Sequence, residues 1–127
     1  GARDGVGVTW RGRLTAPELR AALDDADAVA VPSLWPEPFG LVGIEAQARG
    51  RPAVAYQVGG IDDWIAGAGL AVRRGDEDAL ATAIRTVLDE SIWPRLSAAA
   101  RVRAENYRLD AHVERLLDIF EGARVTA

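Results

Sequence analysis

Residues Pro32 to Gly60, PSLWPEPFGLVGIEAQARGRPAVAYQVGG, decide the fold. The pattern predicts a strand end, a rigid proline loop, a helix, a second strand and a glycine turn. We expect the helix from about Phe39 to Arg49, because Gly50 is a favoured residue just past a helix end. The second strand is expected over residues 52–56, which are apolar.

Two carboxylates in this stretch are placed for binding. Glu37 lies between two prolines, and each proline fixes its own φ and restricts the residue before it. Gly40 opens the helix, whose first N–H groups have no intrahelical partner and carry partial positive charge. Such a terminus suits an anion such as a diphosphate. Glu45 lies about one turn further on, within reach of a hydroxyl-bearing group attached to that anion.

Upstream of this stretch, the sequence predicts a strand, a helix and a second strand. Residues 5–12 alternate in part and end on glycine, which favours a short strand. Thr15 is expected to cap a helix in a capping box with Glu18. Residues 28–32 form an apolar run that is typical of a buried parallel strand.

Downstream, the pattern predicts a short helix over residues 61–66 and a strand over residues 70–73. Asp76 is expected to cap a helix that runs to about residue 89. Residues 91–123 are helical in pattern, with interruptions near Pro94 and around residues 106–110.

Alternating strands and helices predict a parallel sheet with crossover helices, so we expect an α/β, Rossmann-like fold in one domain spanning residues 1–127. Ligands of such sheets bind beyond the carboxyl ends of the strands. The Glu37 loop and Gly59-Gly60 both follow predicted strands. We therefore expect these two segments to line one cleft.

The composition is that of an ordinary globular domain, with 49% hydrophobic and 27% charged residues. The net charge of -4 gives no general reason to expect nucleic acid or an anionic membrane as partner. There are no cysteines, which excludes disulfides and cysteine-ligated metals. No apolar run is long enough for a transmembrane segment and no signal-peptide core is present, so a cytoplasmic location is the default expectation.

The central stretch also carries a family resemblance. Residues 37–42 (EPFGLV) and 44–46 (IEA), followed by Gly50 and Pro52, resemble the Glu-x7-Glu signature of retaining GT-B glycosyltransferases. The nearest group is glycosyltransferase group 1, also called family 4. The similarity extends over roughly residues 6 to 90 and would make this chain the carboxy-terminal part of a donor-binding domain.

The resemblance implies a role for each carboxylate. Glu45 would accept hydrogen bonds from the ribose hydroxyls of a nucleotide sugar; alternatively, it is a helix-surface carboxylate. Glu37, the candidate catalytic residue, would contact hydroxyls of the donor sugar near the N–H groups of Phe39 and Gly40. The alternative for Glu37 is a salt bridge within the loop.

Backbone groups complete the implied site. The N–H groups of Leu41 and Val42 would meet the diphosphate and stabilise the leaving group. Gly59 and Gly60 would let the backbone approach the donor, although plain turn residues would look the same. Gly43 replaces a larger apolar residue of the family, and we expect it to loosen helix packing slightly.

The implied reaction transfers a sugar from a nucleotide-diphosphate sugar to a hydroxyl acceptor with retention, without a metal or a cofactor. The family's leading strands, its basic pair and its amino-terminal acceptor domain have no counterpart here. His112 falls in the carboxy-terminal helical region, so we interpret it as a surface or packing residue rather than as the family's catalytic histidine.

Several alternatives remain open. The strand at residues 5–12 lacks an obvious neighbour, so the chain is expected to be part of a longer protein or to associate through that unpaired edge. A compact monomer in light scattering would contradict such association. A non-catalytic nucleotide-sugar-binding module and a Rossmann-like interaction domain are the other functional hypotheses. The spacing Asp25-x-Asp27 formally matches a metal-binding pair of another glycosyltransferase fold, but we favour a solvated helix end, because two lone carboxylates make a poor magnesium site without oxygen ligands from a substrate.

Overall fold

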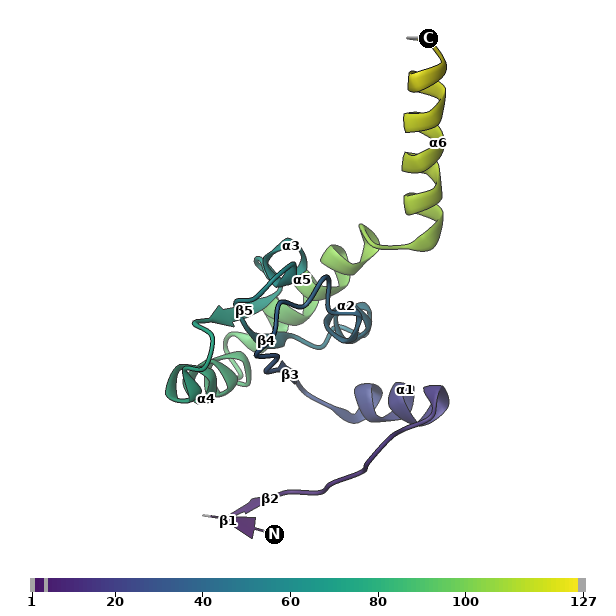
Figure 1. Cartoon of the computed structure of the whole chain (residues 1–127). Coiled ribbons are helices and arrows are strands. Elements are labelled where there is room, and N and C mark those ends of the chain that lie inside the picture. Colours follow the sequence, from purple (N-terminus) through teal and green to yellow (C-terminus); the bar gives the residue numbers. More distant parts are fainter. Residues whose placement is uncertain (1, 4, 126–127) are drawn as a thin grey trace.

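A three-stranded parallel sheet is the centre of the computed structural model, which describes residues 2–3 and 5–125. The strands lie in the order β3-β4-β5 and span Val29–Val31, Ala53–Tyr56 and Gly69–Val72. Helix α2 (Leu41–Ala48) connects β3 to β4, and helix α3 (Ile61–Ile65) connects β4 to β5. The predicted α/β fold with a parallel sheet and flanking helices is confirmed (Figure 1).

Helices cover both faces of the sheet because successive residues of the buried strand β4 point to opposite sides. On one face, α2 and α3 pack over a cluster formed by Val31, Ala53, Ala55, Ile61, Trp64 and Ile65. On the other face, α4 (Glu77–Val87) packs against β4 and β5. Leu96, near the start of α5 (Trp93–Glu105), joins Val54, Ala83 and Val87 in a second cluster there, while α5 also packs against α2.

The predicted helix ends are confirmed by their hydrogen bonds. Asp76 caps α4, because its carboxylate accepts from the N–H of Ala79 at 2.9 Å. Gly50 follows α2 with a φ of 69°, and the N–H of Arg51 donates back to the carbonyl of Ala46 at 2.9 Å. This pattern is a Schellman ending, which satisfies a terminal carbonyl of the helix.

The capping box at the start of α1 (Ala16–Asp25) is also present. The Glu18 carboxylate accepts from the Thr15 hydroxyl at 2.6 Å and from the Thr15 N–H at 2.8 Å. These hydrogen bonds hold the pKa of Glu18 below its ordinary value, the hydroxyl contributing most. The stabilisation from this cap is therefore present above the ordinary pKa and is lost as the pH falls through the lowered one.

We expect Thr15→Ala to raise the pKa of Glu18 towards its ordinary value, because the hydroxyl donor is removed. An NMR titration of the carboxyl carbons would measure this shift. The pKa of Asp89, which hydrogen bonds to Ser91 lower, is the internal control and should not move. An unchanged Glu18 pKa in the variant would contradict the cap.

The amino-terminal segment differs from the prediction. Only Val6–Gly7 of the expected strand over residues 5–12 is a strand, and this β2 pairs antiparallel with β1 (Ala2–Arg3) in a hairpin apart from the sheet (Figure 1). Val6, in β2, is exposed. A strand needs a neighbour, and none of the described residues supplies one in the parallel sheet. Among the described strands, β3 and β5 are therefore the two edges of the parallel sheet, and association through an edge stays a prediction.

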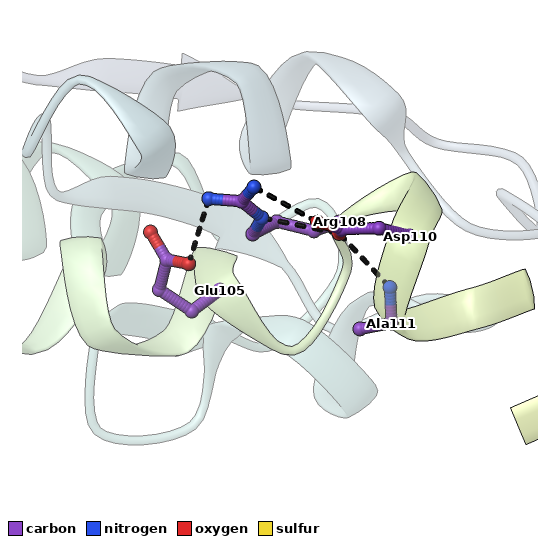
Figure 2. A network of polar contacts seen from close by, with 4 residues as sticks. All are labelled: Glu105, Arg108, Asp110 and Ala111. Atoms are coloured by element: carbon purple, nitrogen blue, oxygen red, sulfur yellow. Dashed lines mark hydrogen bonds and ion pairs between the residues drawn. The ribbon is translucent and has the colours of Figure 1, made fainter. Parts of the chain in front are cut away.

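Helix α6 (Leu109–Val125) projects away from the sheet and the other helices, as Figure 1 shows. The predicted interruption before it is an elbow in which Arg108 bridges Glu105 at 3.4 Å and Asp110 at 2.9 Å (Figure 2). The hydrogen bond with Asp110 is the main cause that raises the pKa of Arg108. His112 is exposed on α6, as expected of a surface residue. None of the described helices meets the length and apolarity that a membrane span requires.

Candidate functional site

The Glu37 loop and the glycine turn meet beyond the carboxyl ends of β3 and β4. The two strands run parallel, with Val31 level with Ala55, so the segments that follow them emerge at the same edge. The N–H of Gly60 donates to the carbonyl of Glu37 at 2.9 Å. The structure thus brings these predicted site segments together, in direct contact.

This contact explains both glycines. A Cβ on Gly59 would lie 2.0 Å from the carbonyl oxygen of Glu37, and one on Gly60 would lie 2.3 Å from that of Pro38. Gly59 also has a φ of 54°, in the left-handed region that favours glycine. Glycine is required here by the close approach of another backbone segment.

The Glu37 side chain is oriented by its own loop. It is partly buried, and the hydroxyl of Ser33 donates to its Oε2 at 3.0 Å. The alternative of a salt bridge is not found for Glu37 among the described residues. Trp35 is 68% exposed, so its ring does little to support the loop.

The amino terminus of α2 presents free donors next to this loop. Gly40 caps the helix with a φ of 82° and is buried against Ile61, 3.1 Å from the position of a Cβ. The N–H of Gly43 donates to the carbonyl of Gly40 at 3.0 Å. The N–H groups of Leu41 and Val42 precede this bond and have no partner within the helix, as expected of the first turn.

Glu45 lies on the side of α2 that faces α1. It lines a pocket of about 260 Å³ together with Ala16, Leu19, Arg20, Leu23 and Arg49. Arg49 holds the two helices together there, because its Nε lies 3.0 Å from an Asp24 carboxylate oxygen and its Nη1 donates to the Glu45 carbonyl at 3.0 Å. The Glu45 side chain is thus associated with the α1–α2 pocket, whereas Glu37 is associated with the glycine turn.

Sequence reasoning missed the residues that support the loop from beneath. Trp64 is fully buried, and its indole N–H donates to the carbonyl of Phe39. A Cβ on Gly43 would lie 2.1 Å from the Trp64 ring, so Gly43 does not loosen the packing as expected but makes room for the indole. A glycine inside a helix was the available signal, because it often marks such a close approach.

Tyr107 and Arg74 reach the same region from distant parts of the chain. The Tyr107 ring meets Phe39 edge-on, with centroids 5.3 Å apart and an interplanar angle of 63°. Arg74, just after β5, donates from Nη1 to the Leu34 carbonyl at 3.3 Å. No local pattern indicates either contact, because the partners lie far apart in sequence.

The alternative metal pair lies outside this region. Asp25 ends α1, and the backbone carbonyl of Asp27 accepts from the indole N–H of Trp93 at 2.7 Å. Within residues 2–3 and 5–125, no group of three or more His, Cys, Asp or Glu side chains is arranged to hold a metal ion.

Comparison with known proteins identifies the family. Residues 2–90 match the family described as glycosyl transferases group 1. The chain belongs to this glycosyltransferase family. Glycogen synthase of Mycobacterium tuberculosis (strain CDC 1551 / Oshkosh) is 40% identical over 100 residues, which are 77% of this chain. The match spans only 23% of that relative's length.

Solved structures extend the similarity of the group 1 chain into its carboxy-terminal helices. Sucrose-phosphate synthase from Thermosynechococcus elongatus matches with a TM-score of 0.79 and 31% identity, over 94% of this chain and 31% of that one. Anabaena HepE, solved in complex with UDP-glucose, matches with a TM-score of 0.69 and 24% identity, over 83% of this chain and 30% of that one. The predicted GT-B family relationship is confirmed.

Proposed function

We propose that this chain is the carboxy-terminal part of a GT-B donor-binding domain. The complete enzyme transfers a sugar from a nucleotide-diphosphate sugar to a hydroxyl acceptor, with retention at the anomeric carbon. Retention follows from the family resemblance. The match to glycogen synthase spans 23% of that relative's length. In this proposal the acceptor site belongs to other parts of the complete enzyme, and the location is cytoplasmic.

The observation that supports this proposal is the order of groups from the Glu37 loop along α2. Glu45 lies on the α1 side, the free N–H groups of Leu41 and Val42 lie at the helix start, and Glu37 lies beside the glycine turn. This order matches that of ribose, diphosphate and sugar in an extended donor. A helix terminus also stabilises the charge that develops on a departing diphosphate, which requires no metal ion.

The two carboxylates bind opposite ends of the donor. Glu45 accepts hydrogen bonds from the ribose hydroxyls, since a carboxylate is an acceptor that can bind two hydroxyls at once. Glu37, held by Ser33, accepts from hydroxyls of the sugar close to the bond that breaks. The N–H groups of Phe39 and Gly40 lie next to it in the chain and line the same part of the site.

Calorimetric titration with UDP, GDP, ADP and TDP tests the proposal. We expect saturable binding of one nucleotide, weakened at least about tenfold by Glu45→Ala, since hydrogen bonds to a charged group are worth roughly 1.5–3 kcal/mol. Glu77→Ala is the matched control, because Glu77 is an exposed carboxylate in the first turn of α4. Absence of binding by all four nucleotides, or equal affinity of the Glu45 variant and wild type, would contradict the proposal.

A further inference from the structure

The turn after α5 contacts the candidate site on two sides at once. The ring of Tyr107 packs against Phe39 in the loop, and its hydroxyl donates to the backbone carbonyl of Asp63 in α3 at 2.6 Å. Arg103 donates to the same carbonyl. Tyr107 thus joins the loop to the helix that follows the glycine turn.

The Tyr107 contacts add to two hydrogen bonds that already connect the Glu37 loop with α3 and its N-cap. In these bonds, the Gly60 N–H donates to the Glu37 carbonyl, and the Trp64 indole N–H donates to the Phe39 carbonyl. The first bond ties the loop to the N-cap of α3, and the second ties it to a residue within α3. Tyr107 makes the remaining connection, because its two ends hold the loop and α3 at a fixed separation.

We propose that Tyr107 is a positioning residue for the sugar end of the donor site. It sets the Phe39 loop against α3 and thereby fixes Glu37 relative to the start of α2. This inference rests on the proposed function. Because Glu45 lies on the other side of α2, towards α1, Tyr107 acts on the sugar end of the site rather than on the ribose end.

The test compares two ligand classes with graded variants. Affinities for the four nucleoside diphosphates and for their glucose conjugates are measured for wild type, Tyr107→Phe and Tyr107→Ala. We expect Tyr107→Phe, which retains the ring, to weaken glucose-conjugate binding about fivefold and Tyr107→Ala to weaken it more, while diphosphate affinity changes less than about twofold. If Tyr107 had a merely structural role, its substitution would lower the affinity for both ligand classes equally.

The adjacent residue provides the matched control. Arg108 forms the elbow with Glu105 and Asp110 (Figure 2), so Arg108→Ala perturbs the same turn without removing either Tyr107 contact. This variant should bind both ligand classes like wild type. Equal loss in the Arg108 and Tyr107 variants would overturn the positioning role.

A spectroscopic readout follows the supporting contacts without any ligand. The indole N–H resonance of Trp64 reports its bond to the Phe39 carbonyl, and we expect it to shift in both Tyr107 variants while that of Trp93 stays in place. An unmoved Trp64 resonance would overturn the positioning role of Tyr107 but not the proposed function. The same holds if Tyr107→Phe leaves the ratio of diphosphate affinity to glucose-conjugate affinity unchanged. Failure of the wild-type chain to bind any ligand overturns the proposed function.

Discussion

Replacing Gly43 with alanine should lower the free energy of unfolding by about 2 kcal/mol, although alanine is the better helix former. The new Cβ would lie 2.1 Å from the ring of Trp64, which is fully buried. Overpacking of this kind costs typically 1–3 kcal/mol, and the upper end applies because neither the helix backbone nor the indole can move freely. The gain in helix propensity of roughly 1 kcal/mol offsets only part of that cost.

The same substitution at Gly122 is the matched control. Gly122 also lies within a helix, but a Cβ there would meet no atom within 4 Å. Gly122→Ala should therefore be neutral or stabilising by up to about 1 kcal/mol. Both changes in the free energy of unfolding are measured by denaturant titration, as shifts of the midpoint at an unchanged m-value. Equal midpoints for the two variants would show that Trp64 does not constrain α2.

Gly59→Ala should abolish binding of the nucleotide sugar. Its Cβ would lie 2.0 Å from the carbonyl oxygen of Glu37, and these are backbone atoms that can separate only if the loop moves. The displaced loop carries Glu37 and leads directly into the amino terminus of α2. The variant should therefore lose its response to both the diphosphates and their glucose conjugates in calorimetry.

Gly67→Ala separates this effect from backbone strain. Gly67 has a φ of 78°, but a Cβ there would meet nothing within 4 Å. Both variants carry the left-handed penalty of about 1–2 kcal/mol, so both should lower the unfolding midpoint. Only Gly59→Ala should lose binding. Wild-type affinity in the Gly59 variant would show that contact between the loop and the turn is not needed for the site.

Local chemistry made much of the fold predictable. Three helix ends are each formed by residues only a few positions apart, so a short window of sequence contains both partners. They are the capping box of Thr15 with Glu18, the Asp76 cap and the ending at Gly50. The Glu37 loop and Gly59-Gly60 were predictable as neighbours for a different reason. Parallel strands place their carboxyl ends on one edge whatever the connecting sequence is.

The failed predictions depended on distant partners. Residues 5–12 have an alternating pattern, but only two of them form a strand because a pattern does not supply a neighbour. Gly43 was judged by helix propensity alone, whereas Trp64, 21 positions later, decides what it does. The contact between Phe39 and Tyr107 had no local signal.

The contact with Tyr107 also sets a time order during synthesis. The Tyr107 hydroxyl binds the carbonyl of Asp63 across a separation of 44 residues. At roughly 5–20 residues per second, a ribosome needs about 2–9 seconds to add that length of chain. Throughout this interval the Glu37 loop, the Gly60 turn and Trp64 have already been made, yet the ring that completes their support has not. The support of the site is therefore completed last from its carboxy-terminal side, and a chain that ends before residue 107 keeps the Gly60 and Trp64 hydrogen bonds to the loop but lacks the Tyr107 contacts.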